Sequence, residues 1–254
     1  MDAVTPPQIE GRGHPESAWQ GSRWLADLPT QPYGKLLNGT RRLVIISPHP
    51  DDEVLGCGGL IHHARQAGLQ VCLLSVTRGE ACYPGHLRWT RDRLGTMRGE
   101  ELLRAVAELG VAPAAVCPLG FPDGGVADHE SSLIDAISTH LAWGDHVFCT
   151  AAWDGHPDHE ATGRAACAAA GVKGLRVSQF PIWAWHWSDP DHPDPPAPGG
   201  ARYTLDPTAW RAKQRAMDCF TSQTIGPGDR PPILPAHVME RFARHEETFF
   251  HGNV

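Results

Sequence analysis

Two short clusters of histidines and carboxylates hold the densest chemistry in the sequence. The first, SPHPDDE, occupies residues 47–53, and the second, HPDH, occupies residues 156–159. Catalytic zinc is held by three His, Asp or Glu ligands, with a fourth position left to water. Zinc lowers the pKa of that water from ~15.7 to about 7, so a nearby carboxylate can take its proton near neutral pH. A positioned histidine can then protonate a leaving group. The two clusters together predict a metal-assisted hydrolase.

Each cluster alone has a structural interpretation. Pro and Asp are frequent in turns, and Asp is a common N-cap, so Asp158 by itself fits the cap of the helix predicted after it. The occurrence of two such clusters, each at the end of a predicted strand, favours the metal site. The glycines at positions 56, 58 and 59 do not form a G-x-G-x-x-G turn, which argues against a dinucleotide site here.

Alternating strand and helix patterns position both clusters. Apolar runs predict buried strands at residues 43–46, 71–76, 114–117, 146–149 and 176–180. Helical patterns follow at residues 53–66, 96–109, 131–143, 158–170 and 207–220. Such repeated units imply a parallel sheet, and ligands of open α/β sheets bind outside the carboxyl ends of the strands. We therefore predict a single Rossmann-like α/β domain with a mostly parallel sheet, helices on both faces and the site at the carboxyl ends of the strands.

Two further segments frame this domain. Residues 1–39 predict an N-terminal arm with one short helix near residues 18–25, laid against the body by Trp19 and Trp24, while residues 40–254 form the domain itself. Tryptophan alternates with other residues at Trp183, Trp185 and Trp187, as on one face of a strand. We favour a strand packed on the core over a platform that stacks on sugar rings.

Composition excludes several classes of partner. Of 254 residues, 22 are basic and 29 acidic, and this intermixed balance with a net charge of −7 predicts no binding to nucleic acid. No apolar run is long enough to span a membrane, and residues 1–39 show no secretory signal. The seven cysteines form no C-x-x-C pair, which predicts buried thiols and a cytoplasmic location. Whether the chain acts alone or as a homo-oligomer stays open.

The two clusters resemble a known pair of motifs. PHPDDEVLGCGG at residues 48–59 and HPDH at residues 156–159 are similar to the signature motifs of the PIG-L/LmbE-like deacetylases. These are zinc-dependent N-acetyl hydrolases that act mainly on N-acetylglucosamine conjugates. The resemblance covers about residues 40–250. It implies that His49, Asp52 and His159 are the zinc ligands.

The resemblance also implies the catalytic roles. Asp51 would be the general base, and His156 the acid or oxyanion stabiliser, oriented by Asp158. Spacing alone does not distinguish Asp51 from Asp52. Weaker similarities imply that Arg78 and Asp123 contact substrate, although a strand-end charge and an ordinary turn explain the same residues.

One position departs from the family pattern. Some members place a tyrosine two residues before the HPDH motif, where it helps to stabilise the oxyanion, and this chain has Asp154 there. A carboxylate near developing negative charge opposes catalysis unless it faces away. We therefore expect oxyanion stabilisation to depend on zinc and His156.

The expected activity is removal of an N-acetyl group from a small-molecule amino sugar or glycoconjugate with Zn²⁺ as cofactor, although Fe²⁺ and Co²⁺ suit the same ligands. One alternative is a metal-dependent amidase or esterase with a non-sugar acyl substrate. Another is a sugar- or metal-binding module without turnover. Assays with acetylated sugars and with N-acyl amino acids distinguish these hypotheses.

Overall fold

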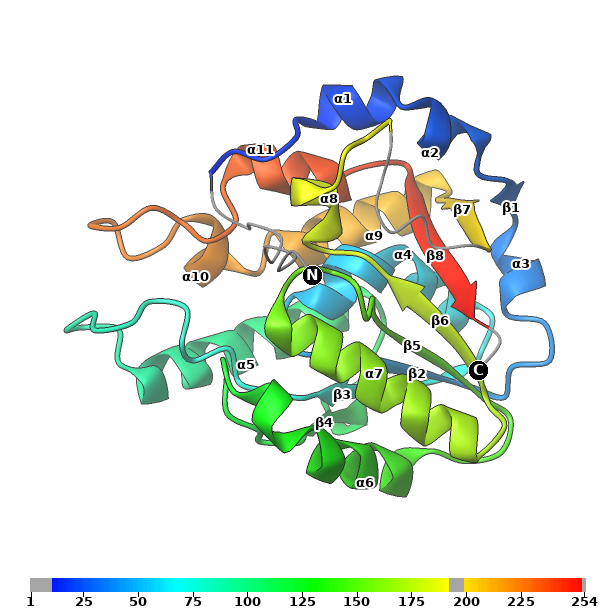
Figure 1. Cartoon of the computed structure of the whole chain (residues 1–254), viewed down its shortest axis with the longest axis horizontal. Helices are drawn as coiled ribbons and strands as arrows, with labels where there is room; N and C mark the ends of the chain where they lie inside the picture. Colours follow the sequence, from blue (N-terminus) through cyan, green and yellow to red (C-terminus); the bar gives the residue numbers. More distant parts are fainter. Residues whose placement is uncertain (1–10, 192–198, 253–254) are drawn as a thin grey trace, which may run out of the picture.

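The five predicted strands form the parallel centre of one eight-stranded sheet (Figure 1). They are β2 (Arg42–Ser47), β3 (Gln70–Ser75), β4 (Val116–Pro118), β5 (Asp145–Thr150) and β6 (Arg176–Phe180). The computed structural model describes residues 11–191 and 199–252. The full strand order is β1-β7-β8-β6-β5-β2-β3-β4, so β2 lies between β3 and β5. The chain order reverses at β2, and such a switch point is where α/β sheets bind ligands.

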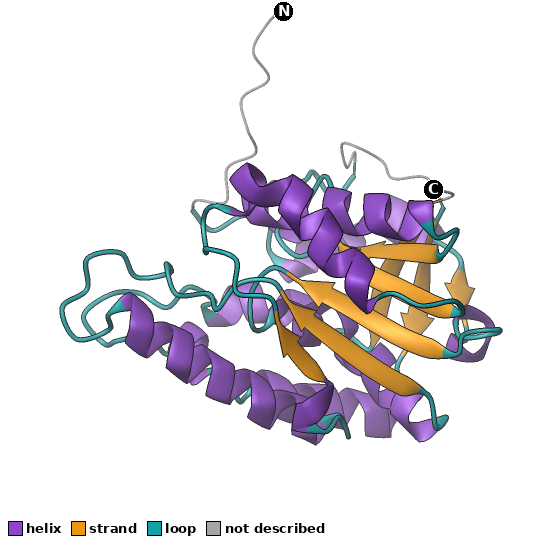
Figure 2. Ribbon diagram, turned by 90° about the horizontal axis from the view of Figure 1, so that it is seen from below, coloured by secondary structure: helices purple, strands orange, loops and turns teal. Residues whose placement is uncertain are grey.

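Helices cover both faces of the sheet (Figure 2). The helices on one face are α4 (Asp52–Gln66), α5 (Arg91–Glu108) and α9 (Pro207–Met217), and those on the other are α6 (Glu130–His140) and α7 (Pro157–Val172). Alternate residues of β2 serve the two layers, since Leu43 and Ile45 pack in one core cluster and Val44 and Ile46 in the other. Single-turn 3₁₀ segments, η1 (Pro113–Ala115) and η2 (Val126–His129), join these elements. The predicted fold class is confirmed.

Three strands were not predicted. β7 (Gly200–Thr204) and β1 (Thr30–Gln31) lie at one edge, and β8 (Glu246–Gly252) runs antiparallel between β6 and β7. β8 begins with two glutamates, so the sequence predicted a polar segment and not a buried strand. In the fold, however, Glu247 points inward and pairs with the buried Lys213 at 2.8 Å. Because a charged residue occupies an inward-facing position, the sequence lacks the alternation of apolar and polar residues by which such a strand is predicted.

Residues 11–39 lie against the rest of the chain through two tryptophans. This segment contains α1 (Glu16–Gly21), α2 (Arg23–Asp27) and α3 (Tyr33–Leu36), so the one predicted helix is two, separated at Ser22. Trp19 is buried and its indole Nε1 donates to the backbone oxygen of Trp185 at 2.8 Å. Trp24 packs against Phe250 with ring centroids 6.1 Å apart. The domain boundary near residue 40 stays a prediction.

The tryptophan-rich segment is a helix, so the predicted strand is wrong. α8 (Ala184–Trp187) places these tryptophans on a helical turn instead of on one face of a strand. Trp185 lies in the core, whereas Trp183 is half-buried at the start of the helix. The last short elements are α10 (Thr221–Thr224), α11 (Ala236–Met239) and η3 (Glu240–Phe242).

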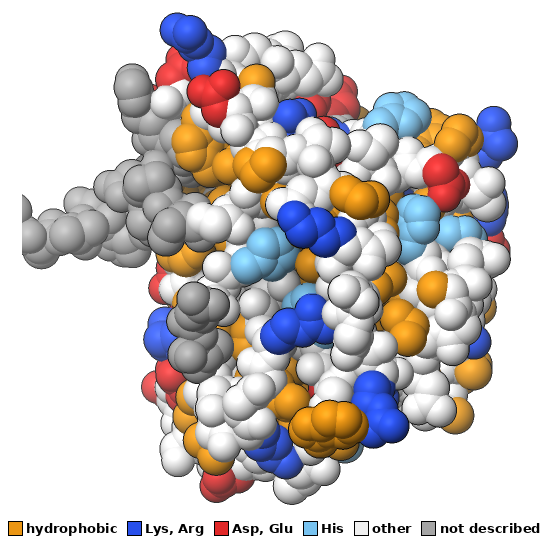
Figure 3. Space-filling view, turned by 90° about the vertical axis from the view of Figure 1, so that its right-hand side faces the viewer, with side chains coloured by type: hydrophobic (Ala, Val, Ile, Leu, Met, Phe, Trp, Pro, Cys, Tyr) orange, Lys and Arg blue, Asp and Glu red, His pale blue; other side chains and the backbone are white. Residues whose placement is uncertain are grey.

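The surface and the cysteines agree with the composition. On the face in Figure 3, basic, acidic and apolar side chains are interspersed. Among the described helices, none is long and apolar enough to cross a membrane. All seven cysteines are free thiols as predicted, but only Cys57 and Cys149 are buried and the other five are half-buried. The cytoplasmic location stays a prediction.

Candidate metal centre and its cavity

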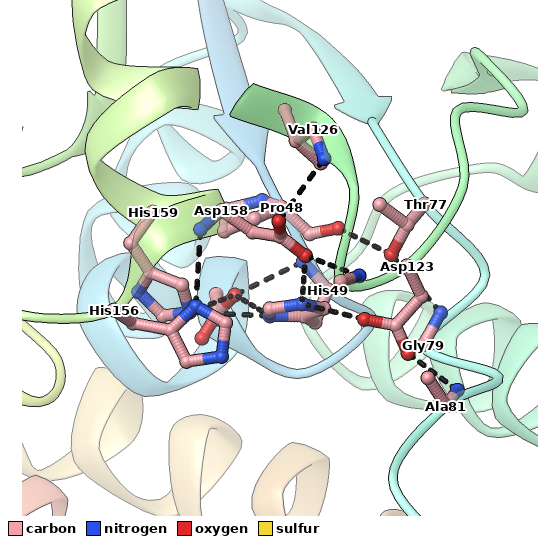
Figure 4. A network of polar contacts seen from close by, with 12 residues as sticks. Pro48, His49, Thr77, Gly79, Ala81, Asp123, Val126, His156, Asp158 and His159 are labelled. Atoms are coloured by element: carbon pink, nitrogen blue, oxygen red, sulfur yellow. Dashed lines mark hydrogen bonds and ion pairs between the residues drawn. The ribbon is translucent and has the colours of Figure 1, made fainter. Parts of the chain in front are cut away.

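The two histidine–carboxylate clusters meet at the carboxyl edge of β2 and β5 (Figure 4). His49 lies in the turn after β2, and Asp52 is the first residue of α4. His156 is the N-cap of α7 and His159 lies in its first turn. Neighbouring parallel strands therefore bring together residues that are more than 100 positions apart.

Three side-chain atoms form a compact triangle in this cluster. His49 Nδ1 lies 3.1 Å from His159 Nε2, and Asp52 Oδ2 lies 3.4 Å from each of these nitrogens. Zinc bonds of about 2.0–2.2 Å in tetrahedral geometry separate neighbouring ligand atoms by about 3.3–3.6 Å. The triangle is close to that size and contains two imidazoles and one carboxylate. It fits a divalent metal ion, and it comprises the three residues that the family resemblance implied.

The far side of the His49 ring faces two carboxylates. His49 Nε2 lies 3.1 Å from Asp123 Oδ1 and 3.3 Å from Asp158 Oδ2. His49, Asp123 and Asp158 could by themselves surround a cation. Their carboxylates, however, already accept backbone N–H groups from Ala81 and Gly124, at 2.6 and 2.7 Å. They are better suited to accept the Nε2 proton of His49, which leaves Nδ1 free to bind a metal.

The Asp158 carboxylate does not contact His156, whose orientation it was expected to set. Besides His49, it accepts the backbone N–H of Val126 at 3.1 Å. His156 instead receives the backbone N–H of Asp158 on Nδ1, at 3.2 Å. A neutral His156 ring therefore carries its proton on Nε2. Burial lowers the pKa of His156 to about 4, against the opposing effect of the Asp158 carboxylate.

Asp51 lies beside the triangle in an unusual backbone conformation. Its φ of 149° is the one positive value of a non-glycine residue in the described part of the chain. Such strain persists where the surrounding structure imposes it, and it clusters at functional sites. The carboxylate is buried and accepts a hydrogen bond from Arg98 at 2.9 Å. Burial raises the pKa of Asp51 to about 7, against the opposing charge of Arg98.

Arg98 is a site residue that the sequence analysis missed. It is 4% exposed, and it also donates to the backbone oxygens of Pro50 at 3.0 Å and Gly79 at 2.9 Å. A signal was present, since Arg98 and Glu101 interrupt the apolar stripe that Leu94 and Leu102 continue on α5. A charged residue on the buried face of a helix has a partner inside the fold.

Asp154 faces away from the cavity. Its fully buried carboxylate accepts the backbone N–H groups of Ile182 at 2.7 Å and Trp183 at 2.9 Å, and its Oδ2 lies 2.8 Å from His159 Nδ1. Burial raises the pKa of Asp154 to about 8, against the pull of these N–H groups. A carboxylate at this position was expected to oppose catalysis unless it faced away, and in the structure it lies outside the lining of the cavity.

His49, Asp52 and His156 of the cluster line a cavity of about 330 Å³, whereas the fully buried His159 does not reach its lining. The polar lining includes His49, Asp51, Asp52, Arg98, Asp123, His156 and Gln223. The apolar wall comprises Leu55, Ile182, Trp183, Ile233 and Leu234. Trp183 thus borders the cavity. Arg78 is outside this lining and donates to the backbone oxygen of Asp92 at 3.2 Å, so its substrate contact stays a prediction.

A larger groove of about 770 Å³ lies elsewhere, bordered by Trp19, Arg202 and Arg244. It contains none of the clustered metal donors. We therefore assign the chemistry to the smaller cavity.

Comparisons with known proteins point to the same chemistry. The sequence model of the PIG-L family, described as GlcNAc-PI de-N-acetylase, matches residues 44–170, which include both clusters. A 1D-myo-inositol 2-acetamido-2-deoxy-alpha-D-glucopyranoside deacetylase of Mycobacterium sp. (strain KMS) is 33% identical over 171 residues, covering 58% of this chain and 54% of the relative. A 2'-N-acetylparomamine deacetylase of Streptomyces fradiae is 32% identical over 151 residues, covering 52% of this chain and 53% of the relative. The chain thus spans about half the length of these two relatives.

Among solved structures, the A40926 pseudoaglycone deacetylase Dbv21 has a similar fold, with a TM-score of 0.66. The match has 24% identity and covers 83% of this chain and 96% of that one.

Proposed function

The chain belongs to the PIG-L family of de-N-acetylases, and from that premise we propose that it is a metal-dependent hydrolase that removes the N-acetyl group of an amino sugar or glycoconjugate. The observation that carries the proposal is the triangle of His49 Nδ1, Asp52 Oδ2 and His159 Nε2, with sides of 3.1–3.4 Å, of which His49 and Asp52 line a cavity. A buried carboxylate and a third histidine border the same cavity.

Each polar residue of the cavity has a task in amide hydrolysis. When bound, a zinc ion supplies a Lewis acid that polarises the acetyl carbonyl and acidifies water. Asp51 accepts the proton of the attacking water, and Arg98 holds the Asp51 carboxylate in place at 2.9 Å. A neutral His156 donates its Nε2–H to the negative charge that develops on the carbonyl oxygen. Asp51 then passes this proton to the amide nitrogen as the carbon–nitrogen bond breaks, so the products are acetate and the free amine.

We propose zinc as the native metal because two imidazoles and one carboxylate form a common catalytic zinc set. Fe²⁺ and Co²⁺ suit the same donors, so metal analysis of the purified protein decides between them. For substrate contacts we propose Asp123, whose carboxylate borders the cavity beside His49. The mycobacterial and Streptomyces relatives are named for acetylated amino sugars, which supports this class of substrate.

The test is a substrate panel assayed for acetate and free amine. The zinc-loaded chain should deacetylate one or more N-acetylglucosamine conjugates, and His159→Ala should release no acetate from them. Turnover of N-acyl amino acids or esters without any acetylated sugar would favour the amidase or esterase alternative. A chain that binds zinc tightly but releases acetate from no substrate would be a binding module.

A further inference from the structure

We propose that Asp154 is a positioning residue for the metal centre: it holds the proton of the His159 ring on Nδ1 and so keeps Nε2 free to bind the ion. The inference rests on the proposed metal site. Asp154 does not border the cavity, so it acts through His159 and not on substrate.

The two side chains meet in a fully enclosed position. Asp154 and His159 are both 0% exposed, and Asp154 Oδ2 lies 2.8 Å from His159 Nδ1. Although these two atoms are close, their alignment does not meet the geometry of a hydrogen bond. Nδ1 therefore has no hydrogen-bond partner among the described residues. A buried ring nitrogen needs a partner. The nearby carboxylate oxygen becomes that partner after a small rotation of the ring.

The opposite side of the ring explains why a positioning residue is needed. His159 Nε2 faces His49 Nδ1 at 3.1 Å and Asp52 Oδ2 at 3.4 Å, and both atoms can accept a proton. Without a competing acceptor, these neighbours would draw the ring proton to Nε2, where it would block metal binding. Burial raises the pKa of Asp154, but the three backbone N–H groups that its oxygens accept and the charge of a bound ion favour the carboxylate form. This carboxylate favours the tautomer of His159 with its proton on Nδ1, and such outer partners commonly orient metal-bound histidines.

Asp154 itself is anchored firmly. Its Oδ1 accepts the backbone N–H groups of Ile182 at 2.7 Å and Ala184 at 3.2 Å, and its Oδ2 accepts that of Trp183 at 2.9 Å. These donors belong to the segment that forms part of the apolar wall. The Asp154 carboxylate therefore joins this wall to a metal ligand, so the position that holds a tyrosine in some family members acts here on the metal centre.

The variant Asp154→Asn tests the proposal. Its amide oxygen can replace Oδ1 toward Ile182 and Ala184, but its NH₂ group then faces Nδ1 and drives the ring proton to Nε2. We expect the zinc dissociation constant to rise about 10–100-fold, measured by competition with a chromophoric chelator. The matched control is Trp187→Phe, which removes the 2.8 Å hydrogen bond from Trp187 Nε1 to the backbone oxygen of Asp154 and leaves the carboxylate in place. The control should bind zinc as the wild type does.

A second measurement does not depend on the variant folding. In the metal-free wild type labelled with ¹⁵N-histidine, the His159 Nδ1 should already carry the ring proton and Nε2 should carry none. A proton on Nε2, or equal zinc affinity of folded Asp154→Asn and wild type, would overturn the role of Asp154. A wild type that binds no metal would instead refute the proposed function.

Discussion

Helix α4 connects two buried clusters of charged residues that differ in how well their polar atoms are paired. At its N-terminus lies the metal centre, with Asp51 and Asp52. Near its middle lies the Glu247 cluster, in which one carboxylate receives Lys213 Nζ at 2.8 Å, Tyr33 Oη at 2.7 Å and the backbone N–H groups of Gly59 and Leu60 at 2.7 and 2.9 Å. The opposite charges of the Glu247 cluster are balanced one to one.

The metal centre lacks this balance. Three imidazole rings lie with centroids 4.6–5.1 Å apart, and the negative charge of Asp52 disfavours that of Asp51. Arg98 Nε and Glu53 Oε1 are buried without a hydrogen-bond partner among the described residues. Burial and neighbouring like charges raise the pKa of Asp51 to about 7 and that of Glu53 to about 8. We infer that the Glu247 cluster stabilises the fold. The charges and polar atoms of the metal centre are instead balanced only when a metal ion and substrate bind there.

The largest expected effect comes from Asp51→Asn. The amide cannot accept the proton of the attacking water, so kcat/KM should fall by about 10²–10⁴-fold. Because the folded protein disfavours the charged form of Asp51, the variant should be no less stable than the wild type at pH 7. Acetate release and urea denaturation of the same samples measure both quantities, with zinc content as control. An active variant would remove Asp51 as the base, and an active variant of Asp52→Asn that lost no metal would reassign both aspartates.

The opposite pattern is expected for Glu247→Gln. Lys213 would remain as an unpaired buried charge, and breaking a buried pair from one side costs about 3–5 kcal/mol. Zinc affinity should stay near that of the wild type below the unfolding transition. The double variant Glu247→Gln/Lys213→Met should recover part of the lost stability because no charge is then left unpaired. If Glu247→Gln lost zinc but not stability, the division between the two clusters would be wrong.

A smaller effect concerns His146, which belongs to neither cluster. Burial and the charge of Arg176 lower its pKa to about 3. Since an unfolded histidine has a pKa near 6.5, only the unfolded chain binds this proton between pH 6.5 and 3, and stability falls as the pH drops. His146 should account for about 2 kcal/mol of the loss between pH 7 and pH 5. Urea denaturation of His146→Gln at both pH values should show a loss smaller by that amount, and an unchanged loss would contradict the assignment.

The sequence predicted the parallel part of the fold because apolar strands and amphipathic helices carry local signals. It also placed His49 and His159 together, since the ends of neighbouring parallel strands meet at one edge. Other features depend on pairing between distant residues. Glu247 makes β8 look exposed although Lys213 neutralises it inside the fold. The Asp158 carboxylate faces His49 and not His156, because the loop containing Gly124 and Val126 fixes it.

The central claim is that His49, Asp52 and His159 bind the catalytic metal. The most direct measurement is anomalous X-ray diffraction from crystals of the zinc-loaded chain. We expect one strong peak per chain within about 2.0–2.2 Å of His49 Nδ1, Asp52 Oδ2 and His159 Nε2. A peak among His49 Nε2, Asp123 and Asp158, or no ordered zinc at this edge of the sheet, would contradict the assignment.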